Sequence, residues 1–438
     1  MIARGLLALR STHLRGIARR LGWGVGDQAV SSLSNFLVGV FVVRSLGATS
    51  FGAFALAYLT YSFVLNASRG LSTDPLLVRF SGAEPGVWRR AVASSSGTAL
   101  VVGVVTGLIC IVIGVFLPPP LNGAFIGLGV GLPGLLLQDS WRFAFFAIGR
   151  GAKSLVNDLV WTMLLISSLV ALEASGRTTV LSCLLAFGLT ATVAAAFGLL
   201  QSQVLPQPRE ARDWVRDHRE LGVRYLLENT TGSGAAQLRA LALGAIAGLA
   251  AVGDVRAAEM LMGPFLVILM GVSQVAVPEA SHVLVRNGPR RLRTFCLILG
   301  GGQAVAAALW GTVLIIALPD GVGQLLLGPT WVAASALVLP VTIAIVWGCF
   351  SASAGAGLRA RGAASRSLNA QLVSCALYLG GGIVGALVAG AAGTCWAAAG
   401  TAFVGALVWW YHLRRATAGD PAPAPLPVGS ALPAGMTT

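Results

Sequence analysis

Charged side chains are scarce in this chain. They make up 11% of its 438 residues, whereas hydrophobic residues make up 56%. A soluble globular domain carries about 25% charged residues, so this deficit excludes an ordinary soluble protein. Acidic residues are rarer than basic ones, with 16 Asp and Glu against 30 Lys and Arg. Because the basic residues are scattered between apolar runs, they indicate orientation in a membrane rather than a nucleic-acid partner.

Residues that build catalytic or metal sites are equally sparse. The six cysteines each stand alone inside an apolar run, no CxxC pair occurs, and the four histidines lie outside those runs. Cysteines in this setting are small core residues. The sequence also lacks a DxD motif and a Ser/His/Asp set, and with 56 glycines a string such as Gly22–Gly26 does not indicate a phosphate loop. We expect no metal, no cofactor and no enzyme activity.

Long apolar runs are what the chain has in abundance. A helix rises about 1.5 Å per residue and the hydrocarbon core is about 30 Å thick, so about 20 residues cross it. The sequence therefore predicts an all-α integral membrane protein with about twelve transmembrane helices. The predicted spans are 22–43, 50–68, 91–117, 122–142, 155–173, 179–204, 222–249, 257–278, 293–318, 331–356, 366–388 and 392–412.

The basic residues fall on one side of these spans. Nearly all lie in every second connecting segment or at the two ends of the chain, while the other turns hold Arg44, Arg177 and Arg256. Positively charged loops stay on the cytoplasmic side, so both termini are expected to be cytoplasmic. Arg239 is different, because it lies within a span.

The longest charged loop divides the spans six and six. The two halves look alike around Ser45–Gly52 and Leu249–Gly253, where one span leads through a short turn into the next. Such a repeat relates the halves by an axis along the membrane normal. Segment 1–21 is predicted to be either a helix on the membrane surface or a disordered leader, and the sequence does not distinguish the two. The predicted units are a basic segment at 1–21, an N-lobe at 22–205, a linker at 206–221, a C-lobe at 222–412 and a disordered Pro-rich tail at 413–438.

Three stretches carry a family resemblance: Gly26–Phe54, Leu137–Arg150 and Leu327–Trp331. They resemble bacterial polysaccharide-export flippases (the Wzx type) of the multidrug/oligosaccharidyl-lipid/polysaccharide (MOP) superfamily. The resemblance implies two pseudo-symmetric six-helix lobes around a central cavity that opens alternately to each side. It also implies a polyprenyl-pyrophosphate-linked oligosaccharide as substrate in the bacterial cytoplasmic membrane, with membrane lipid, a polysaccharide polymerase and glycosyltransferases as partners.

Arg239 is the leading candidate for a substrate contact. A charge within the bilayer is costly unless it faces a cavity or a partner. A pyrophosphate or an acidic sugar needs a permanent cation, and the forked guanidinium matches phosphate geometry. The alternative is a salt bridge within the membrane, to Asp27 or Glu228.

Other polar residues within the spans are secondary candidates for the cavity, among them Glu228, which lies about three turns before Arg239 on the same helical face. Asp27 would serve the cavity or ion coupling, or would only face the positive end of its helix. Asp139 and Arg142 are three residues apart on one helical face and are predicted to pair, either structurally or at the substrate. Glu259 is predicted to be interfacial. Asn35 and Gln237 would line a sugar cavity or join helices by hydrogen bonds.

Three other functions are open. A cation- or proton-coupled multidrug exporter of the same superfamily would use a deeply buried acid, whereas the deep charge here is Arg239. A lipid II flippase usually carries extra spans and several cavity arginines. A polytopic glycosyltransferase would need a large outside loop, and the outside turns are only a few residues long.

Overall fold

The computed structural model describes the backbone of residues 2–81 and 83–418. Within these ranges it leaves some side chains undescribed, and those of Asp27, Asn35 and Glu228 are among them. The predictions for these three side chains therefore lie outside what the structure describes.

The described chain consists of helices joined by short turns and contains no strand. Nine helical stretches within it are long and apolar enough to cross a membrane. The elements are α1 (Ile2–Leu71), α2 (Thr73–Phe80), α3 (Pro85–Phe116), α4 (Leu121–Ala147), α5 (Gly151–Ala174), α6 (Val180–Ser202), η1 (Pro208–Glu210), α7 (Ala211–Asp217), α8 (Arg219–Leu261), α9 (Gly263–Ile316), α10 (Asp320–Leu327), η2 (Gly328–Thr330), α11 (Trp331–Ala360) and α12 (Ala364–Ala418).

Four of the longest helices are pairs of spans joined by a break. The backbone leaves the helical region at Gly47 in α1, Gly248 in α8, Gly288 in α9 and Ala389–Gly390 in α12. All four glycines have positive φ, which a residue without a Cβ adopts at little cost. The predicted eighth span is divided between α8 and α9, because α9 begins at Gly263 with Pro264 in its first turn. These divisions recover the twelve predicted spans.

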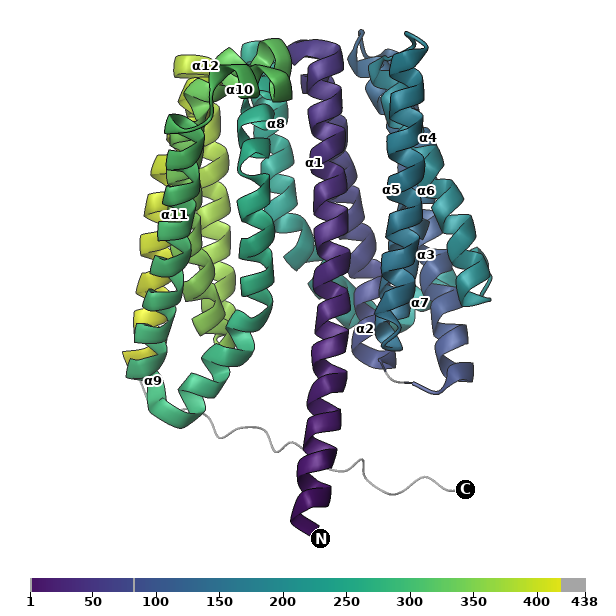
Figure 1. Ribbon diagram of the computed structural model, residues 1–438, viewed down its shortest axis with the longest axis vertical. Helices are drawn as coiled ribbons and strands as arrows, with labels where there is room; N and C mark the ends of the chain where they lie inside the picture. The colour runs from purple at the N-terminus through teal and green to yellow at the C-terminus, as the bar shows by residue number, and fades with distance from the viewer. Residues whose placement is uncertain (1, 82, 419–438) are drawn as a thin grey trace.

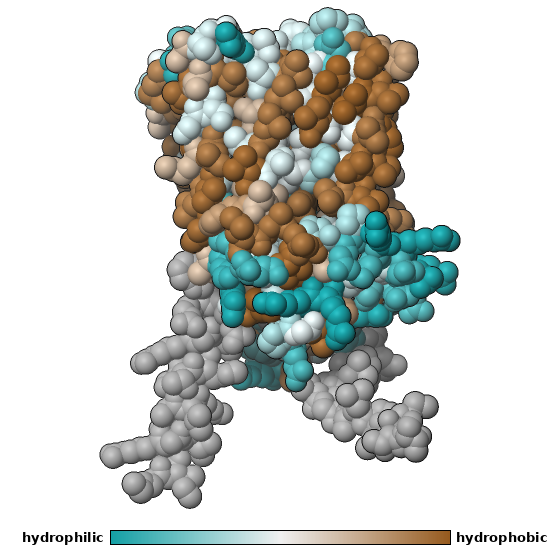
Figure 2. All heavy atoms as spheres, turned by 90° about the vertical axis from the view of Figure 1, so that its right-hand side faces the viewer, coloured by the Kyte–Doolittle hydropathy of each residue, from teal (hydrophilic) through white to brown (hydrophobic). Residues whose placement is uncertain are grey.

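The helices form two groups on either side of α1. Figure 1 shows α9, α11 and α12 on one side and α3, α4, α5 and α6 on the other. The two lobes meet mainly through α1 and α8. In Figure 2 a belt of apolar side chains covers the face, and hydrophilic ones gather at the end where α1 begins. We call this end the arginine-rich end, and the charge distribution predicts that it is cytoplasmic.

The N-lobe is held together by a glycine crossing between α4 and α6. A Cβ on Gly131 would lie 2.6 Å from Cα of Gly188, and a Cβ on Gly188 would overlap the backbone of Gly131. In lipid, helices associate through close packing rather than through a hydrophobic effect, so this backbone contact is a principal source of N-lobe stability.

We expect Gly188→Ala to lower the free energy of unfolding by about 1–3 kcal/mol, because backbone atoms cannot rotate away from the added methyl group. Equilibrium unfolding in detergent micelles measures the change. Gly302→Ala on α9 is the matched control, since a Cβ there has no neighbour within 4 Å. The control should be unchanged or gain up to about 1 kcal/mol of helix propensity. Equal stabilities of the two variants would contradict the proposed role of the crossing.

Candidate functional site

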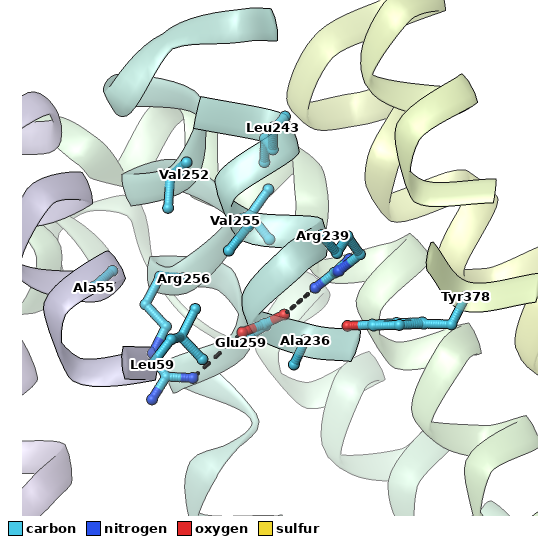
Figure 3. Close-up of a pocket in the computed structure, with 11 residues that line it drawn as sticks. Ala55, Leu59, Ala236, Arg239, Leu243, Val252, Val255, Arg256, Glu259 and Tyr378 are labelled. Atoms are coloured by element: carbon cyan, nitrogen blue, oxygen red, sulfur yellow. Dashed lines mark hydrogen bonds and ion pairs between the residues drawn. The ribbon is translucent and has the colours of Figure 1, made fainter. Parts of the chain in front are cut away.

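A cavity of about 170 Å³ lies between the two lobes. Ala55 and Leu59 of α1 form its N-lobe wall, and residues of α8 and α12 form the rest. Figure 3 shows Arg239, Glu259 and Tyr378 converging on one side of this cavity, with Arg256 nearer to α1.

Arg239 is the buried cation of the cavity. Its side chain is 9% exposed, and Nη2 donates a hydrogen bond of 3.0 Å to Glu259 Oε1. Its Cζ atom lies 4.4 Å from the centre of the Tyr378 ring, a cation–π distance. In the part of the chain that the structure describes, the buried Nε has no hydrogen-bond partner. An unpaired buried N–H is costly, so the hydrogen-bonding capacity of the Arg239 guanidinium is incompletely satisfied in this structure.

Glu259 is shared by two arginines. Arg256 Nη1 lies 3.3 Å from Glu259 Oε2, and the Arg256 guanidinium carbon lies 5.5 Å from the centre of the Tyr58 ring across the lobe boundary. The cluster therefore holds two permanent positive charges and one carboxylate. When that carboxylate is ionised, the cluster carries a net charge of +1, with Arg239 buried and the other two side chains about a third exposed.

The break at Gly248 explains why these residues meet. Arg239 precedes Gly248 by nine residues, and Glu259 follows it by eleven. Because α8 doubles back at this glycine, residues at similar distances before and after it lie at the same level. Sequence spacing within one straight helix would have kept them about 30 Å apart.

The structure gives Arg239 a partner that was not foreseen, namely Glu259. Asp27 and Glu228 were named as its alternative partners, and their side chains lie outside the described structure. Glu259, predicted to be interfacial, lines the cavity, because the second limb of α8 packs against the first. Arg256, predicted in an outside turn, lines the cavity too.

The predicted pairing of Asp139 with Arg142 is also wrong, because Asp139 pairs with Arg69 instead. Arg69 Nε and Nη2 donate to the two carboxylate oxygens of Asp139 at 2.9 and 2.6 Å. Arg69 also lies over the ring of Phe143, with its guanidinium carbon 5.0 Å from the ring centre. A bidentate contact from another helix is geometrically better than one between neighbours on the same helix.

Sequence reasoning missed a buried amide cluster in the N-lobe. Gln138 Nε2 donates to Asp158 Oδ1 at 2.7 Å and to Asn157 Oδ1 at 3.2 Å. Asn157 Nδ2 in turn donates to the carbonyl oxygen of Ala194 at 2.9 Å. The cluster joins α4, α5 and α6, so it has a structural explanation that needs no ligand.

Gln237 joins the lobes and does not line the cavity. Its Nε2 donates to Thr60 Oγ1 of α1 at 2.8 Å. Nearer the arginine-rich end, Asn229 Nδ2 donates to Asp74 Oδ2 at 2.7 Å. Both bonds cross the lobe boundary, so both would have to change if the lobes separated there. Among the described residues, no group of His, Cys, Asp and Glu is placed to hold a metal ion.

Comparison with solved structures places this arrangement among known folds. The chain matches an inward-facing multidrug resistance MATE family transporter of the MOP superfamily with a TM-score of 0.68 and 16% identity, covering 88% of this chain and 94% of that one. The outward-facing structure of such a transporter matches with a TM-score of 0.57 and 15% identity over 92% and 96% of the chains. This chain has the MATE transporter fold.

Another match to the MATE fold differs in its pocket. It is a MOP superfamily transporter from Pyrococcus furiosus described as having a binding pocket of reverse polarity that suggests a different function. Its TM-score is 0.58 at 15% identity, over 92% of this chain and 96% of that one. No family sequence model and no curated protein sequence matches the chain. The expected all-helical, two-lobed architecture of about twelve spans is thus confirmed.

Proposed function

We propose that this protein is a transporter that moves a polyprenyl-pyrophosphate-linked oligosaccharide across the bacterial cytoplasmic membrane by alternating access. The observation that carries the proposal is the net-positive cluster of Arg239, Arg256 and Glu259 at a cavity between the two lobes. A substrate that carries a pyrophosphate would meet a permanent cation at the point where the lobes meet.

The chemistry of the cluster favours an anion. Electrostatic attraction is much stronger in a low-dielectric interior than in water, and Arg remains charged there. Arg239 lines the cavity, and phosphate oxygens accept hydrogen bonds from a guanidinium in a matching fork. A cationic drug would instead be repelled by the same groups.

The remainder of such a substrate has a polar path in the C-lobe. Two further cavities of about 240 and 270 Å³ share Ser351, Gln371 and Trp409 as walls. Tyr378 belongs both to the larger of these cavities and to the cationic cavity. Hydroxyl, amide and indole groups are suited to sugars, whereas a cavity of about 170 Å³ alone holds only a group the size of a phosphate.

A multidrug exporter is the second candidate, because the matching solved structures include multidrug resistance MATE family transporters. That reading would assign substrate or ion coupling to an acid such as Asp158, which is buried with Gln138 and Asn157. A lipid II flippase would use the same phosphate chemistry as the first proposal and differ in the sugar.

We expect Arg239→Ala to reduce transport at least tenfold, because one charge-assisted contact to phosphate is worth about 1.5–3 kcal/mol. The measurement is complementation of a gene deletion, with lipid-linked oligosaccharide on each side of the membrane and surface polysaccharide as readouts. Arg239→Lys should retain partial function, because the charge remains without the fork. Arg177→Ala, at an exposed turn, is the matched control and should transport normally.

Two results would reject the proposal. One is normal surface polysaccharide in the deletion strain together with increased sensitivity to cationic drugs, which would establish the exporter. The other is full complementation by Arg239→Ala at the expression level of the wild type, which would remove the cluster from the transport path.

A further inference from the structure

The lobes touch through two glycines at the end opposite the arginine-rich end. A Cβ added to Gly52 of α1 would overlap the carbonyl oxygen of Leu249, and a Cβ added to Gly253 of α8 would overlap the carbonyl oxygen of Ala48. Both neighbours are backbone atoms, so no side-chain rotation could make room. The two helices can approach this closely only because both positions lack a side chain.

The contact is reciprocal. Gly52 lies five residues after the break at Gly47, and Gly253 lies five residues after the break at Gly248. Each glycine packs against the residue that directly follows the partner's break. The two halves therefore meet through equivalent positions, as across a local two-fold axis, and the positions are the ones at which the sequence halves look alike.

This glycine contact lies directly beyond the cationic cavity. Gly253, Arg256 and Glu259 are spaced three residues apart along one limb of α8, so they share a helical face. On α1, Ala55 of the cavity wall lies one turn beyond Gly52. Gly328, at the start of η2, adds a third segment at this end, where a Cβ would lie 3.7 Å from Cα of Arg44.

We propose that the reciprocal contact of Gly52 and Gly253 is the closure that seals the transport path on the outer side, and that it must separate for the cationic cavity to open outward. This inference rests on the chain being a transporter but not on which cargo it carries.

The contact is suited to repeated opening. It joins backbone to backbone at both glycine positions. A methyl group at either position would prevent full closure and so raise the population of the outward-open state. Gly52 and Gly253 belong to the same contact between α1 and α8, so a methyl group on either glycine already separates the two helices there. The effects of the two substitutions should therefore not add.

The test uses a cysteine reporter in the cavity. Ala236→Cys lies in the cavity wall, and Cys375→Ser removes the native cysteine that is half-buried in the neighbouring cavity. A membrane-impermeant maleimide is added from outside to right-side-out vesicles. We expect Gly253→Ala and Gly52→Ala each to raise the labelling rate about tenfold, and the double variant to match the singles.

Gly302→Ala on α9 is the matched control, because a Cβ there has no neighbour within 4 Å and Gly302 lines none of the three cavities. Control-like labelling of both folded variants would overturn the closure. So would equal labelling of the reporter from the two sides in the protein that keeps both glycines, a measurement that stands even if the variants fail to fold. If labelling changes as expected but the protein does not transport oligosaccharide, the proposed closure is supported and the proposed substrate is rejected.

Discussion

Replacing Asp139 with asparagine is expected to lower the free energy of unfolding by about 3 kcal/mol, near the lower end of the range for a broken buried ion pair. The substitution keeps the shape of the side chain but leaves the Arg69 guanidinium without its bidentate carboxylate. Asp139 is 8% exposed and Arg69 26%, so water compensates only part of the loss. Equilibrium unfolding in detergent, followed by circular dichroism, measures the change.

Two comparisons make this prediction specific. Asp213→Asn breaks the exposed pair of Asp213 and Arg216, whose side chains are 60% and 68% exposed, and should cost at most about 1 kcal/mol. Arg69→Met combined with Asp139→Leu removes both charges and should recover most of the stability. The loss of unfolding free energy in the double variant is compared with the sum of the losses in Arg69→Met alone and Asp139→Leu alone. If the two are equal, Arg69 and Asp139 do not stabilise the fold as a pair.

Glu259→Ala is expected to have the largest effect in the C-lobe, a loss of about 3 kcal/mol together with loss of transport, because Arg239 is buried although Glu259 itself is 32% exposed. The change removes the single carboxylate that Arg239 and Arg256 share and leaves both positive charges at the cavity without it. Arg239 has little access to water, with 7% of the residue exposed, so hydration cannot replace the lost partner. Glu259→Gln, which retains an acceptor, should lose less.

Inorganic pyrophosphate is the probe for the vacated position. It should raise the melting temperature of Glu259→Ala more than that of the wild type, because it can take the place of the carboxylate between the two arginines. The double variant Arg239→Ala/Glu259→Ala should not respond. Unchanged stability of Glu259→Ala, or an equal response of all three proteins, would show that the cluster is no anion site.

The helices could be predicted from the sequence because the composition of each span shows that it lies in the lipid bilayer. A run of apolar residues long enough to cross the bilayer has few alternatives to a helix, since its backbone groups must be satisfied internally. The turn at Arg44–Gly47 was visible as a charge followed by a glycine, and the structure places the break at Gly47. Likewise α9 begins at Gly263–Pro264, a residue pair that is typical of a helix start because proline is tolerated in the first turn.

The ion pairs could not be predicted in the same way. Spacing along a helix suggested Asp139 with Arg142, whereas Arg69, seventy residues away from Asp139, reaches it from α1. Local spacing says nothing about which helix packs alongside, and that depends on side-chain packing between spans. Arg239 could be singled out as costly in a membrane, but its partner Glu259 becomes visible only once α8 is known to fold back.

A signal for that partner was nevertheless present. The halves look alike at Ser45–Gly52 and Leu249–Gly253, so the sharp turn read from the first half applies to the second. Folding the chain at Gly248 brings Arg239 and Glu259 to one level, which pairs the deepest cation with the nearest acid. The side chains of Asp27 and Glu228 remain candidates from sequence alone.

The one-residue breaks at Gly47 and Gly248 also determine what the protein shows to the outside world. A span that reverses at a single glycine leaves no loop to stand above the lipid headgroups. On the face predicted to be external, these two breaks therefore offer a protease no flexible loop to cleave and an antibody little surface to bind.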